Sequence, residues 1–126
     1  MKIYLKTLVV FLVVFVISGI GCETGDDGEA ELILDGDLLE TYSSDDFPQF
    51  EGYVKNVGDK AAYEVEVEIT CYSDADKTNI IDTAKGYPAN SGNIEPGQRV
   101  FFDAVCFNLQ SHDQIRTYEY EIKYRW

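Results

Sequence analysis

The chain is poor in the residues that most often carry catalysis and metal binding. It has one histidine, three cysteines and one tryptophan among 126 residues. No Cys-x-x-Cys spacing occurs, which argues against a zinc site. There is also no His-Glu-x-x-His stretch and no glycine-rich phosphate loop. His112 stands in the polar stretch Ser111–Gln114, which predicts a solvated loop, and we expect no enzymatic activity.

Basic residues are scarce as well. Lys and Arg together number 10 against 23 Asp and Glu, which gives a formal net charge of −13 at pH 7. Such a chain is repelled by the phosphates of nucleic acids and by anionic lipid head groups. We therefore expect no nucleic-acid partner. The charge itself is explained by the solubility that it confers.

The sequence contains one long apolar run, at its start. Lys2 and Lys6 precede the apolar stretch Thr7–Ile20, which ends in small residues. A positive start, an apolar stretch and a small-residue end are typical of a secretory signal, which we predict at residues 1–21. The alternative is an uncleaved membrane helix, since the run from Ile3 to Ile20 approaches the roughly 20 residues that span a bilayer.

The end of this leader carries a modification motif. The stretch Gly19-Ile20-Gly21-Cys22 resembles a bacterial- or archaeal-type lipobox, although Leu is the usual residue at the position of Gly19. The resemblance implies that the thiol of Cys22 receives a diacylglyceryl group and that Cys22 becomes the N-terminus. Two acyl chains hold a protein stably on a membrane. We expect an extracytoplasmic protein that is anchored to the cell membrane through lipid on Cys22.

The next segment lacks large apolar side chains. Residues 22–31 are rich in carboxylates and glycine, a composition typical of a flexible, self-repelling tether. The remaining residues, 32–126, are enough for one domain with its own core. We predict three parts: a signal peptide at 1–21, an acidic tether at 22–31 and a folded domain at 32–126.

That domain shows no ten-residue amphipathic helical pattern, because its apolar residues recur at every second position. In the last segment, Tyr118, Ile122 and Trp126 belong to a series that alternates with charged residues. Strands are expected at Leu32–Leu34, Leu38–Tyr42, Phe50–Asn56, Tyr63–Cys71, Asn79–Tyr87, Val100–Phe107 and Tyr118–Trp126. About seven short strands separated by turn residues predict an all-β fold, an immunoglobulin-like antiparallel β-sandwich.

Three glycines have predicted structural roles. Gly97 follows a proline in Glu95–Gln98, which favours a type II turn with positive φ at Gly97. Gly52 fits a position where strand backbones approach closely, and Asn56 with Gly58 fits a hairpin corner that tolerates left-handed geometry.

The alternation directs both Cys71 and Cys106 inward from different strands. Outside the cytoplasm such a pair can be oxidised, and we expect a structural disulfide. The alternative is a pair of buried free thiols that pack as small hydrophobic groups.

Several of these stretches, taken in order, resemble an FxLYD-type domain. They are Gly52–Gly58, the alternation around Val65, Tyr72 with Asp74, and Ile94–Gly97 followed by Phe102. The chain departs from the family pattern at the eponymous motif, where Ile69 and Cys71 replace Phe and Leu. The resemblance implies a β-sandwich found in secreted and lipid-anchored proteins, without catalytic residues.

Two hypotheses of function follow. The favoured one is a non-catalytic, lipid-anchored envelope module with a protein partner, which Phe101, Val105 and Phe107 would contact if they face outward. The alternative is a ligand-binding protein that uses acidic loops for calcium or a small cationic solute. Its candidate ligands are Asp74, Asp76 and Thr78, which supply oxygens at alternate positions but lack the rest of an EF-hand pattern.

Overall fold

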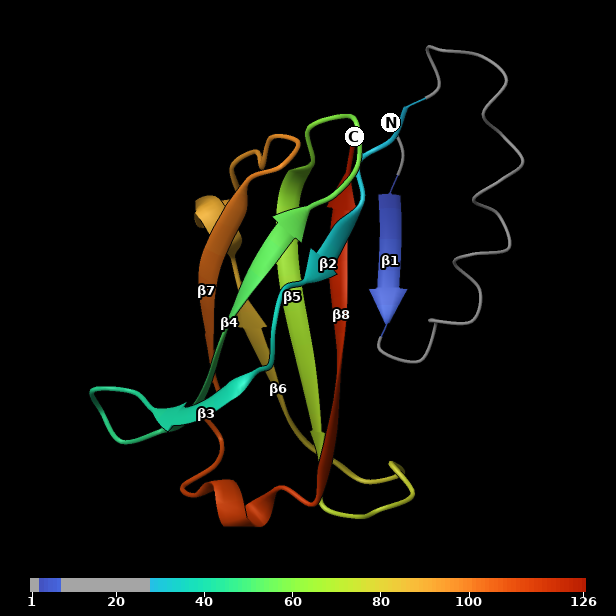
Figure 1. Ribbon diagram of the computed structural model, residues 1–126. Helices are drawn as coiled ribbons and strands as arrows, with labels where there is room; N and C mark the ends of the chain where they lie inside the picture. Colours follow the sequence, from blue (N-terminus) through green and yellow to red (C-terminus); the bar gives the residue numbers. More distant parts are fainter. Residues whose placement is uncertain (1–2, 8–27) are drawn as a thin grey trace.

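The computed structural model describes residues 3–7 and 28–126, and this part of the chain is all-β (Figure 1). Seven strands lie between Leu32 and Arg125, and an eighth lies at the start of the chain. The elements are β1 Ile3–Thr7, β2 Leu32–Leu34, β3 Leu39–Tyr42, β4 Pro48–Asn56, β5 Tyr63–Tyr72, β6 Ile80–Gly86, the 3-10 turn η2 Pro88–Ser91, β7 Arg99–Val105, the 3-10 turn η3 His112–Gln114 and β8 Thr117–Arg125. Most of the predicted leader and tether, Cys22 included, lies outside the described residues.

The strands form two antiparallel sheets. One sheet has the order β1-β8-β5-β6. In the other, β4 pairs with both β2 and β3 along one edge and with β7 along the other edge. The predicted antiparallel β-sandwich of about seven strands is confirmed.

The core lies between the two sheets, as the alternating pattern requires. Val65, Phe102 and Ile122, from three different strands, are no more than 2% exposed. The core cluster extends from Ala30 to Tyr124. The sandwich therefore carries its hydrophobic core within the predicted domain, apart from Ala30 at the end of the tether.

One long-range hydrogen bond links the first strand of this domain to the last. The backbone N–H of Leu32 in β2 donates to the phenol oxygen of Tyr124 in β8 at 3.1 Å, across 92 positions of sequence. Both residues are buried. The phenol therefore satisfies a buried backbone donor that would otherwise carry a desolvation cost.

Tyr63 departs from the prediction that it faces inward. Its side chain is 40% exposed, and the register of β5 with β8 shifts between Tyr63 and Glu66. Glu64 has φ +53°, so the strand is irregular at this point. This irregularity turns the ring of Tyr63 outward, where the guanidinium of Arg125 lies 5.5 Å from the ring centroid.

The predicted role of Gly97 is confirmed, and that of Gly52 was wrong. Gly97 has φ +85°, and the N–H of Gln98 donates to the carbonyl of Glu95 at 3.0 Å, which closes the predicted turn. A Cβ on Gly52 would lie 3.1 Å from the ring of Phe102. The close approach at Gly52 is therefore to a core aromatic ring rather than to a strand backbone.

The prediction of left-handed geometry at Asn56 and Gly58 was wrong, since neither residue has a positive φ. Asn56 is instead fully buried. Its Oδ1 accepts hydrogen bonds from the backbone N–H groups of Glu31 and Gly58 at 3.3 and 2.9 Å. Its Nδ2 donates to the carbonyls of Lys60 and Ile94 at 2.8 and 2.9 Å. We call these five residues the Asn56 junction.

Gly58 is required in this junction by space. A Cβ at this position would lie 2.3 Å from the carbonyl oxygen of Glu29. The predicted hairpin corner is not present either, because the β4–β5 connection crosses from one sheet to the other. The backbone of residues 29–31 lies against this connection, and the N–H of Val57 donates to the carbonyl of Glu31 at 2.7 Å. The sequence therefore places its smallest residue where two backbones meet.

Candidate contact surface

The outer face of the β4–β7 pair carries exposed aromatic rings. The register sets Tyr53 opposite Phe101, and their rings meet edge to face with centroids 5.6 Å apart. The guanidinium of Arg99 lies 3.6 Å from the centroid of the Tyr53 ring, and its Nε donates to Asp35 at 2.7 Å. We call Tyr53, Arg99 and Phe101 the aromatic surface; Tyr87, which follows β6, is a third exposed ring and lines the neighbouring hollow.

These rings leave apolar area in water. Tyr53, Tyr87 and Phe101 are 37%, 47% and 45% exposed. Full burial of a large apolar side chain stabilises by about 1.5–3 kcal/mol. Burial of the area that each ring still exposes would therefore contribute roughly 1 kcal/mol to a contact. Paired aromatic rings beside an arginine are typical of protein contact surfaces.

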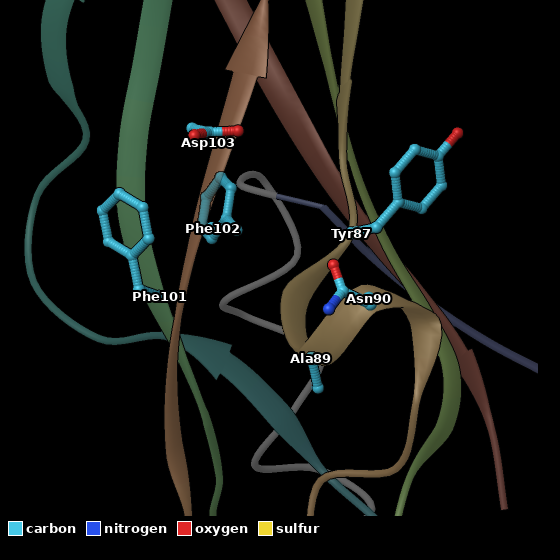
Figure 2. Close-up of a pocket in the computed structure, with 6 residues that line it drawn as sticks. All are labelled: Tyr87, Ala89, Asn90, Phe101, Phe102 and Asp103. Atoms are coloured by element: carbon cyan, nitrogen blue, oxygen red, sulfur yellow. The ribbon is translucent and has the colours of Figure 1, made fainter.

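A hollow of about 250 Å³ adjoins this surface (Figure 2). Strand β7 contributes Phe101, Phe102 and Asp103, and Tyr87 with the η2 turn supplies the remaining lining. In that turn Ala89 and Asn90 have φ +55° and +53°. Two successive non-glycine residues in the left-handed region cost about 1 kcal/mol each, so the turn is the strained part of the lining.

The hollow has few charged or amide side chains in its lining. Its polar side chains are the Asp103 carboxylate and the Asn90 amide, and the other lining residues are apolar or aromatic. A carboxylate beside aromatic rings can receive a cationic or apolar side chain. Across residues 3–7 and 28–126 no group of three or more His, Cys, Asp or Glu side chains could hold a metal ion.

The predicted apolar strip is split between two places. Phe101 belongs to the aromatic surface, and Val105 on the same strand is half-buried. Phe107 is 69% exposed, and its ring packs against Phe47 with centroids 5.6 Å apart. Phe101 is therefore grouped with Tyr53, which sequence reasoning did not assign to the strip, and Phe107 stands in a separate pair.

The predicted calcium ligands lie in the β5–β6 loop. The Asp74 carboxylate accepts hydrogen bonds from the Thr78 hydroxyl, from the Thr78 N–H at 3.1 Å and from the Asn79 N–H at 3.0 Å. These bonds, that of the Thr78 hydroxyl first, hold the pKa of Asp74 below its usual value. Asp76 is exposed. Both Asp74 oxygens already accept bonds within the loop, and calcium binding stays a prediction.

The two core cysteines face each other. Their sulfurs are 3.9 Å apart, against about 2.05 Å in a disulfide, and both are buried free thiols. The contact with Cys106 and the burial of the site raise the pKa of Cys71 above its usual value. The disulfide stays a prediction for the oxidised protein.

The prediction that His112 is solvated was wrong. Its side chain is 11% exposed, its ring packs edge to face on Phe50 with centroids 5.4 Å apart, and its Nε2 lies 2.6 Å from the Thr41 carbonyl. Ser111 and Gln114 form a capping box that turns this segment back onto the sheet. That Ser-x-x-Gln spacing was visible in the sequence and could have indicated the turn.

The described residues contain no helix that is both long and apolar enough to cross a membrane. Comparisons with family models, with curated proteins and with solved structures give no match for this chain.

Proposed function

We propose that the protein is a lipid-anchored, non-catalytic β-sandwich module of the cell envelope, of the FxLYD type, that contacts a protein partner. The observation that carries the proposal is the exposed pair of Tyr53 and Phe101 on the outer face of the β4–β7 pair. The lipidation motif at Cys22 supports the location. A sandwich tethered by its N-terminus can present this face to other envelope proteins.

The electrostatics favour a partner with cationic groups. The chain has a net charge of −13, and the Asp103 carboxylate lies beside the exposed rings. Complementary charge speeds the encounter of two proteins. Burial of the aromatic rings then supplies the contact energy, since rings of this kind dominate such interfaces.

A photo-crosslinking residue at position 101 tests the contact in the intact protein in its native membrane. We expect one discrete crosslinked product from position 101 and none from position 83, an exposed position on β6 at the far sheet. Tyr53→Ala should abolish the product at 101 because it removes half of the aromatic pair. Equal products from both positions would contradict the proposal.

The anchor has its own test. Cys22→Ser should move the full-length protein from the membrane fraction to the soluble fraction or leave an unprocessed leader. Mass spectrometry of the wild-type N-terminal peptide should find Cys22 as its first residue, with added acyl mass. An unmodified peptide that begins at Met1 would contradict the anchor.

The calcium alternative is separated from this proposal by thermal melting. We expect the melting temperature to be the same with calcium as with chelator, because the Asp74 oxygens already accept three hydrogen bonds. A rise of many degrees with calcium, absent in Asp74→Asn, would favour a calcium-binding protein.

A further inference from the structure

One edge of strand β8 is paired with β1, a strand that belongs to the predicted leader. Along one side β8 pairs with β5, and along the other it pairs with β1, from Ile3 opposite Arg125 to Thr7 opposite Glu121 (Figure 1). Removal of residues 1–21 would take β1 away. A nine-residue strand with unpaired N–H and C=O groups is a template for another strand. The inference below rests on the proposed function, which includes that removal.

The charges on the outer face of β8 are divided along its length. Glu119 and Glu121 lie towards its start, and Lys123 and Arg125 lie towards its end. Two copies of one strand that meet across a twofold axis run antiparallel. The acidic half of one copy then faces the basic half of the other.

The register of such a pair follows from the charges. With Ile122 at the twofold axis, Glu121 faces Lys123 of the second copy and Glu119 faces Arg125 of the second copy. A twofold axis at Glu121 or at Lys123 would place that charged side chain directly opposite the same side chain of the second copy. Opposite charges across strands stabilise a sheet and like charges destabilise it.

The two other nearby registers are excluded on the same ground. A centre at Tyr120 would set Glu119 against Glu121 twice, and a centre at Tyr124 would set Lys123 against Arg125 twice. The inward-facing residues also suit the Ile122 register, because it pairs Tyr120 with Tyr124 and Ile122 with itself. Aromatic and β-branched residues form favourable cross-strand pairs.

Within one chain, Glu121 lacks a cation. It stands opposite Glu68 of β5, and the nearby ammonium group of Lys123 lies 3.2 Å from that same Glu68. In the part of the chain that the structure describes, Glu121 forms no ion pair. We propose that the mature protein forms a twofold dimer by antiparallel pairing of β8 with β8, centred on Ile122, in which Lys123 of the second copy faces Glu121.

Analytical ultracentrifugation tests this dimer with the processed full-length protein in detergent and with the soluble domain, residues 23–126, which contains the core cluster. We expect a dimer whose dissociation constant rises about tenfold in Glu121→Lys, because two attractive pairs become repulsive. The double variant Glu121→Lys with Lys123→Glu should restore association to within about threefold of wild type.

Glu121→Lys separates association from folding. The new lysine stands opposite Glu68, so the substitution removes a like-charge contact inside the chain, and thermal melting at a concentration where the protein is monomeric should not fall. Asp45→Lys is the matched control, since it makes the same change of charge at an exposed position of the β3–β4 loop, in the other sheet. It should leave the dissociation constant unchanged.

Three results would overturn the dimer: a processed protein that stays monomeric at all concentrations, a dimer indifferent to Glu121→Lys, or a dimer broken by Asp45→Lys instead. The mass of the intact protein shows whether residues 1–21 have been removed, and this distinguishes a failure of the dimer from a failure of the proposed function. A full-length protein that keeps residues 1–21 leaves β1 on the edge of β8 and overturns both. A processed monomer overturns the dimer alone and favours a strand from another protein.

Discussion

Two loops at opposite ends of the sandwich are each held by one polar side chain (Figure 1). Asn56 ends β4, is fully buried and bonds to groups as far as 38 positions away along the chain. Asp74 follows β5, and its carboxylate accepts hydrogen bonds from residues four and five positions later, at the surface. One side chain joins distant segments, and the other shapes a single loop.

The difference teaches where a hydrogen bond matters for stability. Water can replace the partners of Asp74, because the loop is exposed. Water cannot readily replace those of Asn56, since a buried group left unpaired keeps its full desolvation cost of about 1–3 kcal/mol. Hydrogen bonds from a side chain to the backbone therefore contribute much more to stability at Asn56 than at Asp74.

The largest expected effect comes from Asn56→Ala. The change removes the bonds of Asn56 to the Gly58 N–H and to the Lys60 carbonyl, whereas the Ile94 carbonyl keeps its bond from the Ala62 N–H. We expect the free energy of unfolding to fall by about 4 kcal/mol. Urea denaturation of the soluble domain measures it. Asn79→Ala, which removes an exposed amide in the Asp74 loop, should stay within about 0.5 kcal/mol of wild type. Equal losses in the two variants would remove the contrast between the loops.

The second effect concerns the close backbone approach in the Asn56 junction. Gly58→Ala places a methyl group 2.3 Å from the Glu29 carbonyl oxygen, so the segment 29–31 must shift away from the β4–β5 connection. We expect a loss of about 3 kcal/mol in the same urea experiment. Val57→Ala, a change at an exposed neighbour, is the control. A Gly58→Ala domain as stable as that control would mean that segment 29–31 is not fixed there.

The third effect is smaller. Asp74→Asn keeps one oxygen acceptor but removes the charge that strengthens bonds to the Thr78 and Asn79 groups. We expect a loss at pH 7 that is clearly less than those of Asn56→Ala and Gly58→Ala, measured by thermal melting. Asp76→Asn, an exposed neighbour with no bond of this kind among the described contacts, should leave the melting temperature unchanged.

The smallest effect is a pH dependence that belongs to Asp74. Its pKa is lowered in the folded protein by the bonds from Thr78 and Asn79. The stabilisation is therefore complete above the unfolded pKa of about 3.9 and is lost as the pH falls through the lower folded-state pKa. The gap in stability between wild type and Asp74→Asn should close as the pH falls below about 4. If the difference in stability between wild type and Asp74→Asn persisted to pH 2, the charge of Asp74 could not be its cause.

The strands could be predicted because their signal is local. The predicted strand Leu32–Leu34 coincides with β2, and the last strand is shifted by one residue, since alternation of apolar and charged side chains needs only neighbouring positions. The irregularity at Glu64 interrupts this rule, so the exposure of Tyr63 could not be predicted.

The junction and the site depend on tertiary contacts that no local pattern carries. Asn56 was taken for a turn residue because its sequence neighbours suit a turn, whereas its partners Glu31 and Ile94 come from distant segments. Likewise, Tyr53 joined the aromatic surface through the register of β4 with β7. The pairing of β1 with β8 was missed because its residues were assigned to the leader.

The bond from Leu32 to Tyr124 has a consequence for biogenesis. A ribosome or a secretion channel releases a polypeptide gradually, from its first residues to its last. The Leu32 N–H in β2 therefore finds this partner only after β8, the last strand, has been synthesised.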